Sequence, residues 1–496
     1  MIFTIHSKCQ ICGKAVNRII KAMEEDEKVI IYGDYDVDGI TSTMVLKKFL
    51  GEHGLNVGYK IPNRLNEGYG LNKGAVKKIA DDGYHLIITV DCGISGVEEI
   101  EYAKELGMEV IVTDHHEPQE KIPDCTAVID CKRKDNTYPF KNLAGCGVVL
   151  KLIQAISKQK GYKDEDYLKF LDIVCIGTIS DIVPLVDENR VIAKLGLMLI
   201  KQTRNPGLNY LIHSTDFKEV NSMAVSFGLA PRINACGRMG FEEEALKLFL
   251  TDNLEEAKNI TIKLNDFNKK RQEIEKNIFE DAMKQIEEQH MENAPIIVVG
   301  GEGWHHGVIG IVSSKITDLY YKPSILVCFE GETAKGSGRS IPGFDLHEAL
   351  CGAGEYLTKY GGHEMAIGLS LEKKNFENFK KKIEEIASKS NLEELVPVLK
   401  IDKELNASDI TEENIEALGK LEPFGESNKN PLFLYKNLKI DSIRSLSEGK
   451  HLKLTLKDDV ANIVILGIGF NMGNLVEDYR LFDKVDVVRN IRIQRI

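Results

Sequence analysis

The chain lacks any long apolar run, has a single Trp, and shows no second cysteine pair to accompany Cys9 and Cys12. No stretch approaches the roughly 18 apolar residues of a membrane span, and the opening residues MIFTIHSKCQICGK lack a signal-peptide layout. We therefore expect a cytoplasmic protein with no membrane partner. Ten Cys in 496 residues do not suggest a disulfide framework, and the isolated Cys9-x-x-Cys12 pair favours ordinary thiols over a zinc site.

The residues that are present are typical of a soluble globular protein, with 43% hydrophobic and 28% charged side chains. The length predicts two or three domains. The net charge of −12 argues against a general nucleic-acid coat protein. It does not exclude a nucleic-acid enzyme that concentrates its acids around metals and lines one groove with basic groups.

Strand and helix signals alternate from residue 28 to residue 131. This alternation predicts an α/β fold with a doubly wound parallel sheet, whose ligands gather at the carboxyl ends of the strands. The segments Leu143–Lys158 and Tyr167–Ile179 are either two buried helices or a helix and a strand, because their period is ambiguous. The apolar runs that we assign to strands are Val29–Tyr32, Val57–Ile61, Leu86–Val90, Val110–Thr113 and Ala127–Ile129.

Apolar residues at three- and four-residue steps predict one long amphipathic helix over Ile260–Gln289. A second, smaller α/β unit follows, with strands at Pro295–Val299 and Ser324–Phe329 and helices at Gly307–Leu319 and Leu346–Tyr356. Short alternating runs near the end predict a small β-barrel. The predicted domains are a catalytic domain over residues 1–255, a connector helix over 256–292, a substrate-binding domain over 293–392 and a barrel over 393–496.

Three carboxylates, Asp34, Asp36 and Asp38, follow the first apolar run at every second position, and a helix is predicted to begin near Ile40. The spacing also matches the start of a calcium-binding EF-hand loop, which needs a Glu at its twelfth position and a helix before it. Val45 stands at the twelfth position, and a strand is predicted before the loop. The EF-hand is therefore excluded.

Further acids and imidazoles follow later segments: Asp91 after the third run, Asp114, His115 and His116 after the fourth, and Asp181 after a less certain element. Each alone is a weak signal, because an Asp after a strand is most often a helix N-cap. Together with the first three acids they bring about five negative charges to one cleft, from Asp34, Asp36, Asp38, Asp91 and Asp181, and two divalent cations nearly neutralise that charge. Mixed carboxylate and imidazole ligands favour Mn²⁺, with Mg²⁺ second, and two such ions can hydrolyse a phosphodiester.

The series GDYDVDG, VDCG, TDHH and SDIVPL resembles the four motifs of the DHH phosphoesterase family. GSGRS at 336–340 and GGHEMAIG at 361–368 resemble the DHH-associated C-terminal domain. Four further segments are similar to the RecJ family of single-strand-specific 5′→3′ DNA exonucleases: PNRLNEGYGLN (62–72), APRINACGRMG (230–240), GWHHGVIGIVSSK (303–315) and LEPFGESNKNPLF (421–433). In that family the terminal barrel is an OB-fold.

The resemblance implies roles for residues at the matching positions. His116 would donate a hydrogen bond to the scissile phosphate, or would instead orient His115, and Asp91 would bridge two ions. The implied metal ligands are Asp36, Asp38, Asp91, His115 and Asp181, with Asp34 in or near the same shell. The implied substrate contacts are Arg238 and Asn234 in a predicted loop, Arg339 and Ser340, and Gly362 and His363 in a predicted turn, whereas Arg232 would serve structural pairing.

Two parts of the chain depart from the family pattern. The motif has one His where His305 stands, so we expect the His305-His306 pair to support folding of the second unit, with metal binding as the alternative. RecJ proteins usually have a longer lead-in and another strand or two at the end. Truncation at either end would leave the metal centre intact and weaken DNA binding.

The leading hypothesis is a metal-dependent 5′→3′ exonuclease that releases mononucleotides from single-stranded DNA in repair and recombination. The resemblance implies a helicase and a single-strand-binding protein as partners. One alternative is a DHH oligoribonuclease or cyclic-dinucleotide phosphodiesterase, although those relatives usually end after the second domain. The other is a non-catalytic DNA-binding scaffold, which would lack some of the metal ligands.

Overall fold

The computed structural model describes residues 10–459 and 463–491. Residues 1–397 form one compact unit and residues 398–496 a second. Of the isolated cysteine pair, Cys9 lies outside the described residues and Cys12 is buried. Across the described ranges, none of the helices combines the length and the apolar run that a bilayer crossing needs.

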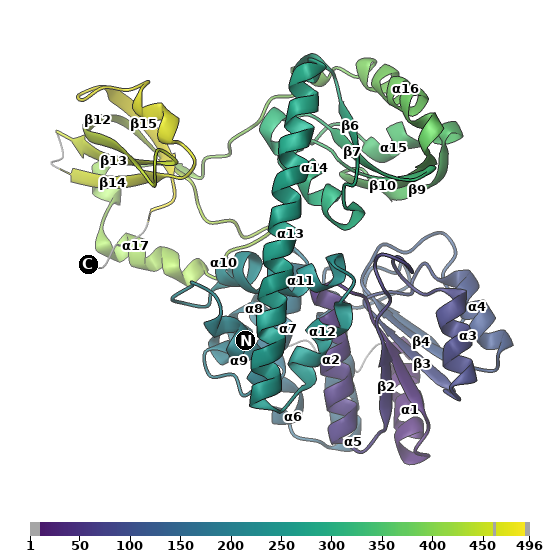
Figure 1. The fold of residues 1–496 in the computed structure, drawn as a ribbon. Coiled ribbons are helices and arrows are strands. Elements are labelled where there is room, and N and C mark those ends of the chain that lie inside the picture. Colours follow the sequence, from purple (N-terminus) through teal and green to yellow (C-terminus); the bar gives the residue numbers. More distant parts are fainter. Residues whose placement is uncertain (1–9, 460–462, 492–496) are drawn as a thin grey trace. The chain divides into compact units, whose positions relative to one another are not determined.

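A five-stranded, fully parallel sheet forms the centre of the first half of the chain (Figure 1). All five predicted strands are present, in the order β2-β1-β3-β4-β5. Parallel sheets need cover on both faces, which explains their almost unbroken apolar runs. The strands are β1 (Val29–Tyr32), β2 (Val57–Lys60), β3 (Leu86–Val90), β4 (Glu109–Asp114) and β5 (Ala127–Asp130).

Helices cover the two faces of this sheet in separate cores. Val29 and Ile31 pack in one core with α1 (Gln10–Glu24), α2 (Val37–Glu52) and α5 (Gly145–Lys160). Ile30 and Tyr32 point to the other core, with α3 (Lys73–Asp81) and α4 (Val97–Glu105). The side chains of a strand alternate between its faces, so one apolar run supplies both cores.

A helical region follows the sheet: α6 (Glu165–Leu168), α7 (Leu171–Ser180), α8 (Asp187–Ile200), α9 (Pro206–His213), α10 (Ser222–Ala224), the π-helical turn Val225–Leu229, α11 (Ala230–Arg238) and α12 (Glu242–Leu250). Both ambiguous segments are helices, since they contain α5 and α7. The prediction of a loop over APRINACGR was wrong, because these residues form α11. Its Pro231 lies in the first turn, where a helix tolerates proline.

The predicted long helix is α13 (Leu254–Glu288). Its first half contributes Ile260 and Leu264 to the core under the parallel sheet, and its second half contributes Ile278 and Ala282 to a core of the second sheet. The helix therefore belongs to both cores, as a connector should.

The second sheet contains five strands in the order β6-β7-β8-β10-β9. The strands are β6 (Ile297–Glu302), β7 (Ser324–Glu330), β8 (Thr333–Arg339), β9 (Leu357–His363) and β10 (Ala366–Glu372), with helices α14 (His306–Tyr320), α15 (Leu346–Cys351) and α16 (Phe376–Ser388). Only β6 and β7 were predicted. Strands β8 and β9 carry GSGR and GGH, whose glycines hide the strand pattern, so the predicted GGH turn was wrong. Helix α15 also ends at Cys351, before the predicted Tyr356.

Residues 398–496 form a small unit with its own core of Tyr435, Leu438, Ile440 and Leu456. Its described strands are β11 (Lys403–Glu404), β12 (Phe433–Leu446), β13 (His451–Asp458), β14 (Ile463–Gly469) and β15 (Lys484–Arg489), and its helix is α17 (Glu412–Leu418). The long strand β12 pairs with β13 and β15 in antiparallel fashion and with β11 in parallel, so the sheet is mixed.

Candidate metal centre

Three strand ends and one helix end bring the predicted acids together. Asp34 and Asp36 follow β1, Asp91 follows β3, His115 follows β4, and Asp181 caps the C-terminal end of α7. Parallel strands deliver these side chains to one edge of the sheet. The position of Asp181 depends instead on how α7 packs against the sheet domain.

Helix α2 begins at Val37, earlier than the predicted Ile40. Asp36 is its N-cap, and the Asp36 carboxylate accepts a 3.0 Å hydrogen bond from the Gly39 N–H. Asp38 lies in the first turn, where the positive end of the helix dipole stabilises a carboxylate. The spacing of the three acids thus combines a strand end, a helix cap and a first helical turn.

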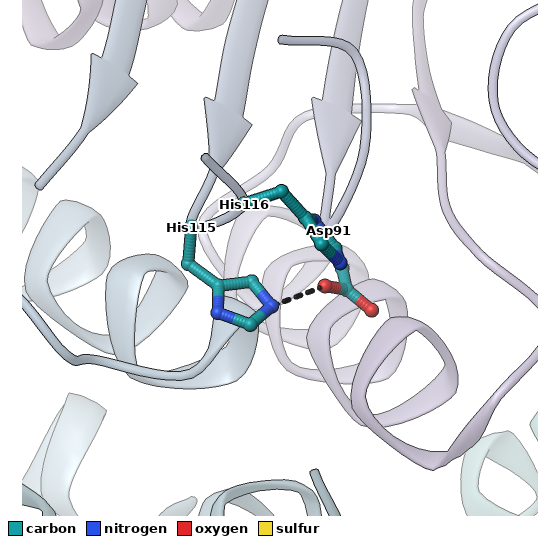
Figure 2. A group of neighbouring side chains, drawn as sticks. All are labelled: Asp91, His115 and His116. Carbon is teal, nitrogen blue, oxygen red and sulfur yellow. Dashed lines mark ion pairs between the residues drawn. The ribbon is translucent and has the colours of Figure 1, made fainter. Parts of the chain in front are cut away.

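The ligand atoms fall into three overlapping groups, each with its atoms within 4.8 Å of one another. The groups are Asp34, Asp36 and Asp91; Asp38, His115 and Asp181; and Asp91, His115 and His116. Figure 2 shows the His115 ring directed at Asp91, with 3.0 Å between Nε2 and Oδ1. The same Nε2 lies 3.5 Å from Asp181 and 3.7 Å from Asp38. Asp91 therefore lies between the groups, where a bridging ligand belongs.

Several of these atoms are buried without a hydrogen-bond partner. Among the described residues they include Asp34 Oδ1, Asp91 Oδ1 and His115 Nε2. An unsatisfied buried acceptor costs about 1–3 kcal/mol, and bound cations would satisfy these atoms. The donor set consequently fits divalent cations that prefer oxygen and imidazole ligands.

The pKa values of the carboxyl groups in this centre show that the negative charges repel one another. Burial, and then the charges of neighbouring aspartates, raises the pKa of Asp38 to about 6 and that of Asp181 to about 9. The pKa of Asp91 is also raised, by burial and then by Asp38. Burial, followed by the charge of His116, lowers the pKa of His115 to about 3 and keeps its imidazole neutral, as a metal ligand must be. Bound cations would relieve the repulsion among the carboxylates.

Glycines allow the backbone to approach the acids. The N–H groups of Gly145 and Cys146, at the start of α5, donate to Asp38 at 2.6 and 2.8 Å. A Cβ on Gly145 would lie 2.8 Å from that of Asp91, and one on Gly177 would lie 2.9 Å from Asp38. These supports were not predicted, because only the packing of α5 and α7 reveals them.

His116 is held by an acid that the sequence analysis did not assign. Asp114 is the last residue of β4 and not a helix cap. Its buried carboxylate lies 2.7 Å from His116 Nδ1 and accepts from the N–H groups of Ile94 and His115. Burial opposes a charge on His116, yet the hydrogen bond and charge of Asp114 raise the pKa of His116 to about 9. The contact with Asp114 therefore favours a protonated His116, which can donate a hydrogen bond.

A cluster of arginines gathers around Arg238 of α11. Arg238 is largely buried and donates a 2.8 Å hydrogen bond to the Gly307 carbonyl. Burial, and then the charges of Arg64, Arg271 and Arg339, lowers the pKa of Arg238 to about 9. Guanidinium groups that lower one another's pKa repel one another, and an anion bound among them would offset this repulsion. Arg64 and Arg271 were not predicted, although Arg64 lies in the PNRLNEGYGLN segment.

Three further residues considered in the sequence analysis lie on α11 and directly after β8, and their side chains have different partners. Asn234 is half-buried on α11, one turn before Arg238. Arg232 donates to Asn265 and to the Gly228 carbonyl, in agreement with structural pairing. Ser340 is buried, and its hydroxyl donates to the Phe344 carbonyl at 2.7 Å, so it is not available to a ligand.

Ser337 takes the position that we had expected for Ser340. It lies two residues before Arg339 on β8, which places both side chains on one face of the strand. The Arg339 guanidinium donates to the Ser337 hydroxyl at 3.2 Å. Reading GSGRS as a strand would have identified Ser337, because alternation excludes Ser340 from that face.

Gly362 and His363 lie on β9, which is the edge strand of the second sheet. His363 and Arg339 both pair with Ala366 of β10, so about two strand spacings, or 10 Å, separate them. Gly362 has a φ of +141°, and a Cβ at this position would lie 2.3 Å from the Ala366 carbonyl oxygen. The side chain of His363 is exposed, so a ligand could contact it from the solvent.

This arrangement of acids and imidazoles at one sheet edge defines a member of the DHH family. Residues 28–178 match the N-terminal domain of the DHH family, and residues 293–389 match the DHHA1 domain. Residues 401–496 match the RecJ OB domain. Within the DHH family, the chain belongs to the RecJ family, which confirms both the resemblance and the predicted fold class.

The similar proteins cover nearly the whole chain. The single-stranded-DNA-specific exonuclease RecJ of Salmonella typhimurium is 34% identical over 95% of this chain and 86% of its own length. The RecJ protein of Bacillus subtilis is 39% identical over 97% of this chain and 61% of its own length. A crystal structure of RecJ from Thermus thermophilus with Mn²⁺ aligns with a TM-score of 0.81 and 31% identity, covering 93% of this chain and 66% of that one.

The same Thermus protein in complex with Mg²⁺ aligns with a TM-score of 0.77 and 29% identity, covering 97% of this chain and 67% of that one. The chain thus spans under two thirds of the length of the Bacillus relative and of the Mn²⁺-bound Thermus chain.

Proposed function

We propose that this chain is a metal-dependent 5′→3′ exonuclease that hydrolyses single-stranded DNA to mononucleotides. The observation that carries the proposal is that Asp91 and His115, 3.0 Å apart, link two ligand groups into one centre, since this geometry suits two-metal phosphodiester hydrolysis. The names of the relatives support the substrate, because these proteins are called single-stranded-DNA-specific exonucleases.

Two divalent cations would occupy the centre, with Mn²⁺ preferred and Mg²⁺ accepted. Asp34, Asp36 and Asp91 would hold one ion, and Asp38, Asp91, His115 and Asp181 the other. The solved RecJ structures with Mn²⁺ and with Mg²⁺ support both ions. When bound, the ions supply the positive charge that activates water and stabilises the leaving oxygen.

The chain's own residues would orient the substrate. His116, held as a cation by Asp114, would donate a hydrogen bond to an oxygen of the scissile phosphate. Arg238, Arg339 and Arg64 would bind phosphate, and Asn234, Ser337, Gly362 and His363 would complete the contacts to the terminal nucleotide. Residues 398–496 would provide the platform for the rest of the strand.

The two alternatives are less well supported. An oligoribonuclease or cyclic-dinucleotide phosphodiesterase would not need residues 401–496, which match the RecJ OB domain. A non-catalytic scaffold would not keep a complete ligand set. We also propose the domain division at residues 255, 292 and 392, a cytoplasmic location, a role in DNA repair and recombination, and a helicase and a single-strand-binding protein as partners.

The test offers the purified chain three substrates with Mn²⁺ and then with EDTA: 5′-labelled single-stranded DNA, blunt duplex DNA and a short oligoribonucleotide. We expect labelled mononucleotide from the single strand alone, and only with metal. Preference for the oligoribonucleotide would support the first alternative. Binding without cleavage under Mn²⁺ and Mg²⁺ would support the second.

A further inference from the structure

A second group of metal-binding side chains lies outside the metal centre, on the second sheet. His306 is the first residue of α14, and Cys328 and Glu330 lie near the end of β7. Cys328 and Glu330 are two residues apart on a strand, so their side chains project from the same face. The arrangement is not part of the family motif, in which a single His corresponds to His305.

The distances in this group match a metal site. His306 Nδ1 lies 2.7 Å from Glu330 Oε1, Cys328 Sγ lies 4.0 Å from the same oxygen, and all three ligand atoms lie within 4.8 Å of one another. The point that is equally distant from these three atoms therefore lies no more than about 2.4 Å from each of them. Zinc is bound at about 2.3 Å by sulfur and about 2.0–2.2 Å by nitrogen or oxygen, so small shifts would complete the coordination.

The surroundings leave this group open on one side and closed on the other. Cys328 is buried, whereas the side chains of His306 and Glu330 are 22% and 40% exposed. Lys335 lies 3.5 Å from Glu330 Oε2, which turns the other oxygen, Oε1, toward His306 and Cys328. An ion could therefore enter from solvent and meet the thiol at the inner end.

A simple ion pair explains only part of this geometry. A partly exposed His–Glu ion pair contributes about 0–1 kcal/mol to the free energy of unfolding, and it needs no third side chain. It does not account for a buried thiol beside the same carboxylate oxygen. One thiolate and one carboxylate also balance the charge of one divalent cation, with the imidazole neutral.

We propose that His306, Cys328 and Glu330 bind one Zn²⁺ ion, with an open fourth position for water. The thiolate selects a borderline-soft ion over Mn²⁺ or Mg²⁺, which prefer oxygen ligands. This site is therefore chemically distinct from the metal centre, which holds carboxylates and imidazole.

The ion would fix the start of α14 beside the arginine cluster. Gly307 follows His306, and its carbonyl accepts the hydrogen bond of Arg238. His305 is the N-cap of α14, and its Nδ1 accepts from the Gly307 N–H at 3.1 Å. His305 thus holds the backbone by itself, while His306 ties the same turn to β7 through the ion.

Cobalt spectroscopy tests the site without relying on nuclease activity. The full chain, freed of metal with EDTA, is titrated with Co²⁺ while the thiolate-to-cobalt charge-transfer absorbance is followed. The band is expected to reach the intensity of one thiolate-bound Co²⁺ per chain, to disappear on adding Zn²⁺, and to be absent in Cys328→Ser. Cys351→Ser is the matched control, since Cys351 is exposed on the same domain and should keep the band.

The partly exposed ligands provide a second measurement. His306→Gln should weaken Co²⁺ affinity at this band at least about tenfold, whereas Glu332→Gln, an exposed acid two residues after Glu330, should leave the affinity unchanged. No band in the unaltered chain, or an equal band in Cys328→Ser, would overturn the proposal. If Cys328→Ser does not fold, unchanged affinity in His306→Gln would overturn it equally.

Discussion

At the residue scale, the candidate metal centre consists of side chains whose close approach is unfavourable without a cation. Burial and mutual repulsion raise the pKa values of Asp34, Asp91 and Asp181, and several ligand atoms are buried without a hydrogen bond. Such a site lowers the free energy of unfolding of the metal-free protein, and metal binding should raise it again. Substitutions in the centre should therefore change stability and catalysis in opposite directions.

Asp91→Asn is the sharpest test of this opposition. Asp91 has a φ of +60°, a conformation that Asn tolerates well, so the backbone should be preserved. We expect a higher Tm in EDTA, loss of the Mn²⁺-dependent rise in Tm, and kcat lower by at least about 10²–10³-fold. Asp124→Asn, at an exposed carboxylate, should change none of these. Retained cleavage in Asp91→Asn would refute the bridging role.

His116→Ala separates the two roles considered for His116. As a donor to the phosphate, its loss should lower kcat by about 10²–10⁴-fold and leave the Mn²⁺-dependent rise in Tm unchanged. As a residue that orients His115, its loss should diminish that rise as well. His213→Ala is the control, because His213 is exposed at the end of α9.

At the element scale, strand ends and helix starts position the site, and glycines allow them to pack closely. Helix α5 approaches Asp38 through Gly145, and helix α7 does so through Gly177. On the second sheet, Gly362 lets β9 turn its backbone against β10 beside His363. The glycines of these motifs therefore serve packing as well as any contact with substrate.

The two neighbouring glycines of β9 make a matched pair for stability measurements. Gly362→Ala should lower the free energy of unfolding by about 1–3 kcal/mol, because its φ is +141° and the new Cβ would lie 2.3 Å from the Ala366 carbonyl oxygen. Gly361→Ala adds the same methyl group with nothing within 4 Å and should be nearly neutral. Equal effects in denaturant titrations would contradict this account.

At the scale of the whole molecule, the chain divides into a unit that contains the metal centre and a small β unit. The metal centre and the arginine cluster both lie within residues 1–397. The small unit has a separate core, so its removal should leave the chemistry intact. Its proposed task is to hold the single strand beyond the terminal nucleotide.

Removal of residues 398–496 tests this division. We expect affinity for long single strands to fall at least about tenfold, while kcat on short oligonucleotides stays within about twofold. Fluorescence anisotropy with long and short strands, beside cleavage of the short one, measures both quantities. Equal losses on long and short substrates would argue against a strand platform.

The sequence by itself determined the parallel sheet, the long helix α13 and most of the candidate ligand set. Apolar runs of β-branched residues identify buried strands, and acids that follow parallel strands must meet at one edge. Asp34, Asp36, Asp91 and His115 could be predicted for that reason. Local periodicity is sufficient for these elements, because their positions follow from the rules of parallel sheets.

Only the tertiary structure decided features that depend on segments far apart in the chain. The end of α7 brings Asp181 to His115, strand β8 exposes Ser337 in place of Ser340, and α14 and β7 bring His306 to Cys328. The glycine-rich strands β8 and β9 and the helix α11 were also not predicted, since their local sequence signals are weak. Packing between distant segments sets these contacts, and no local pattern of apolar and polar residues encodes it.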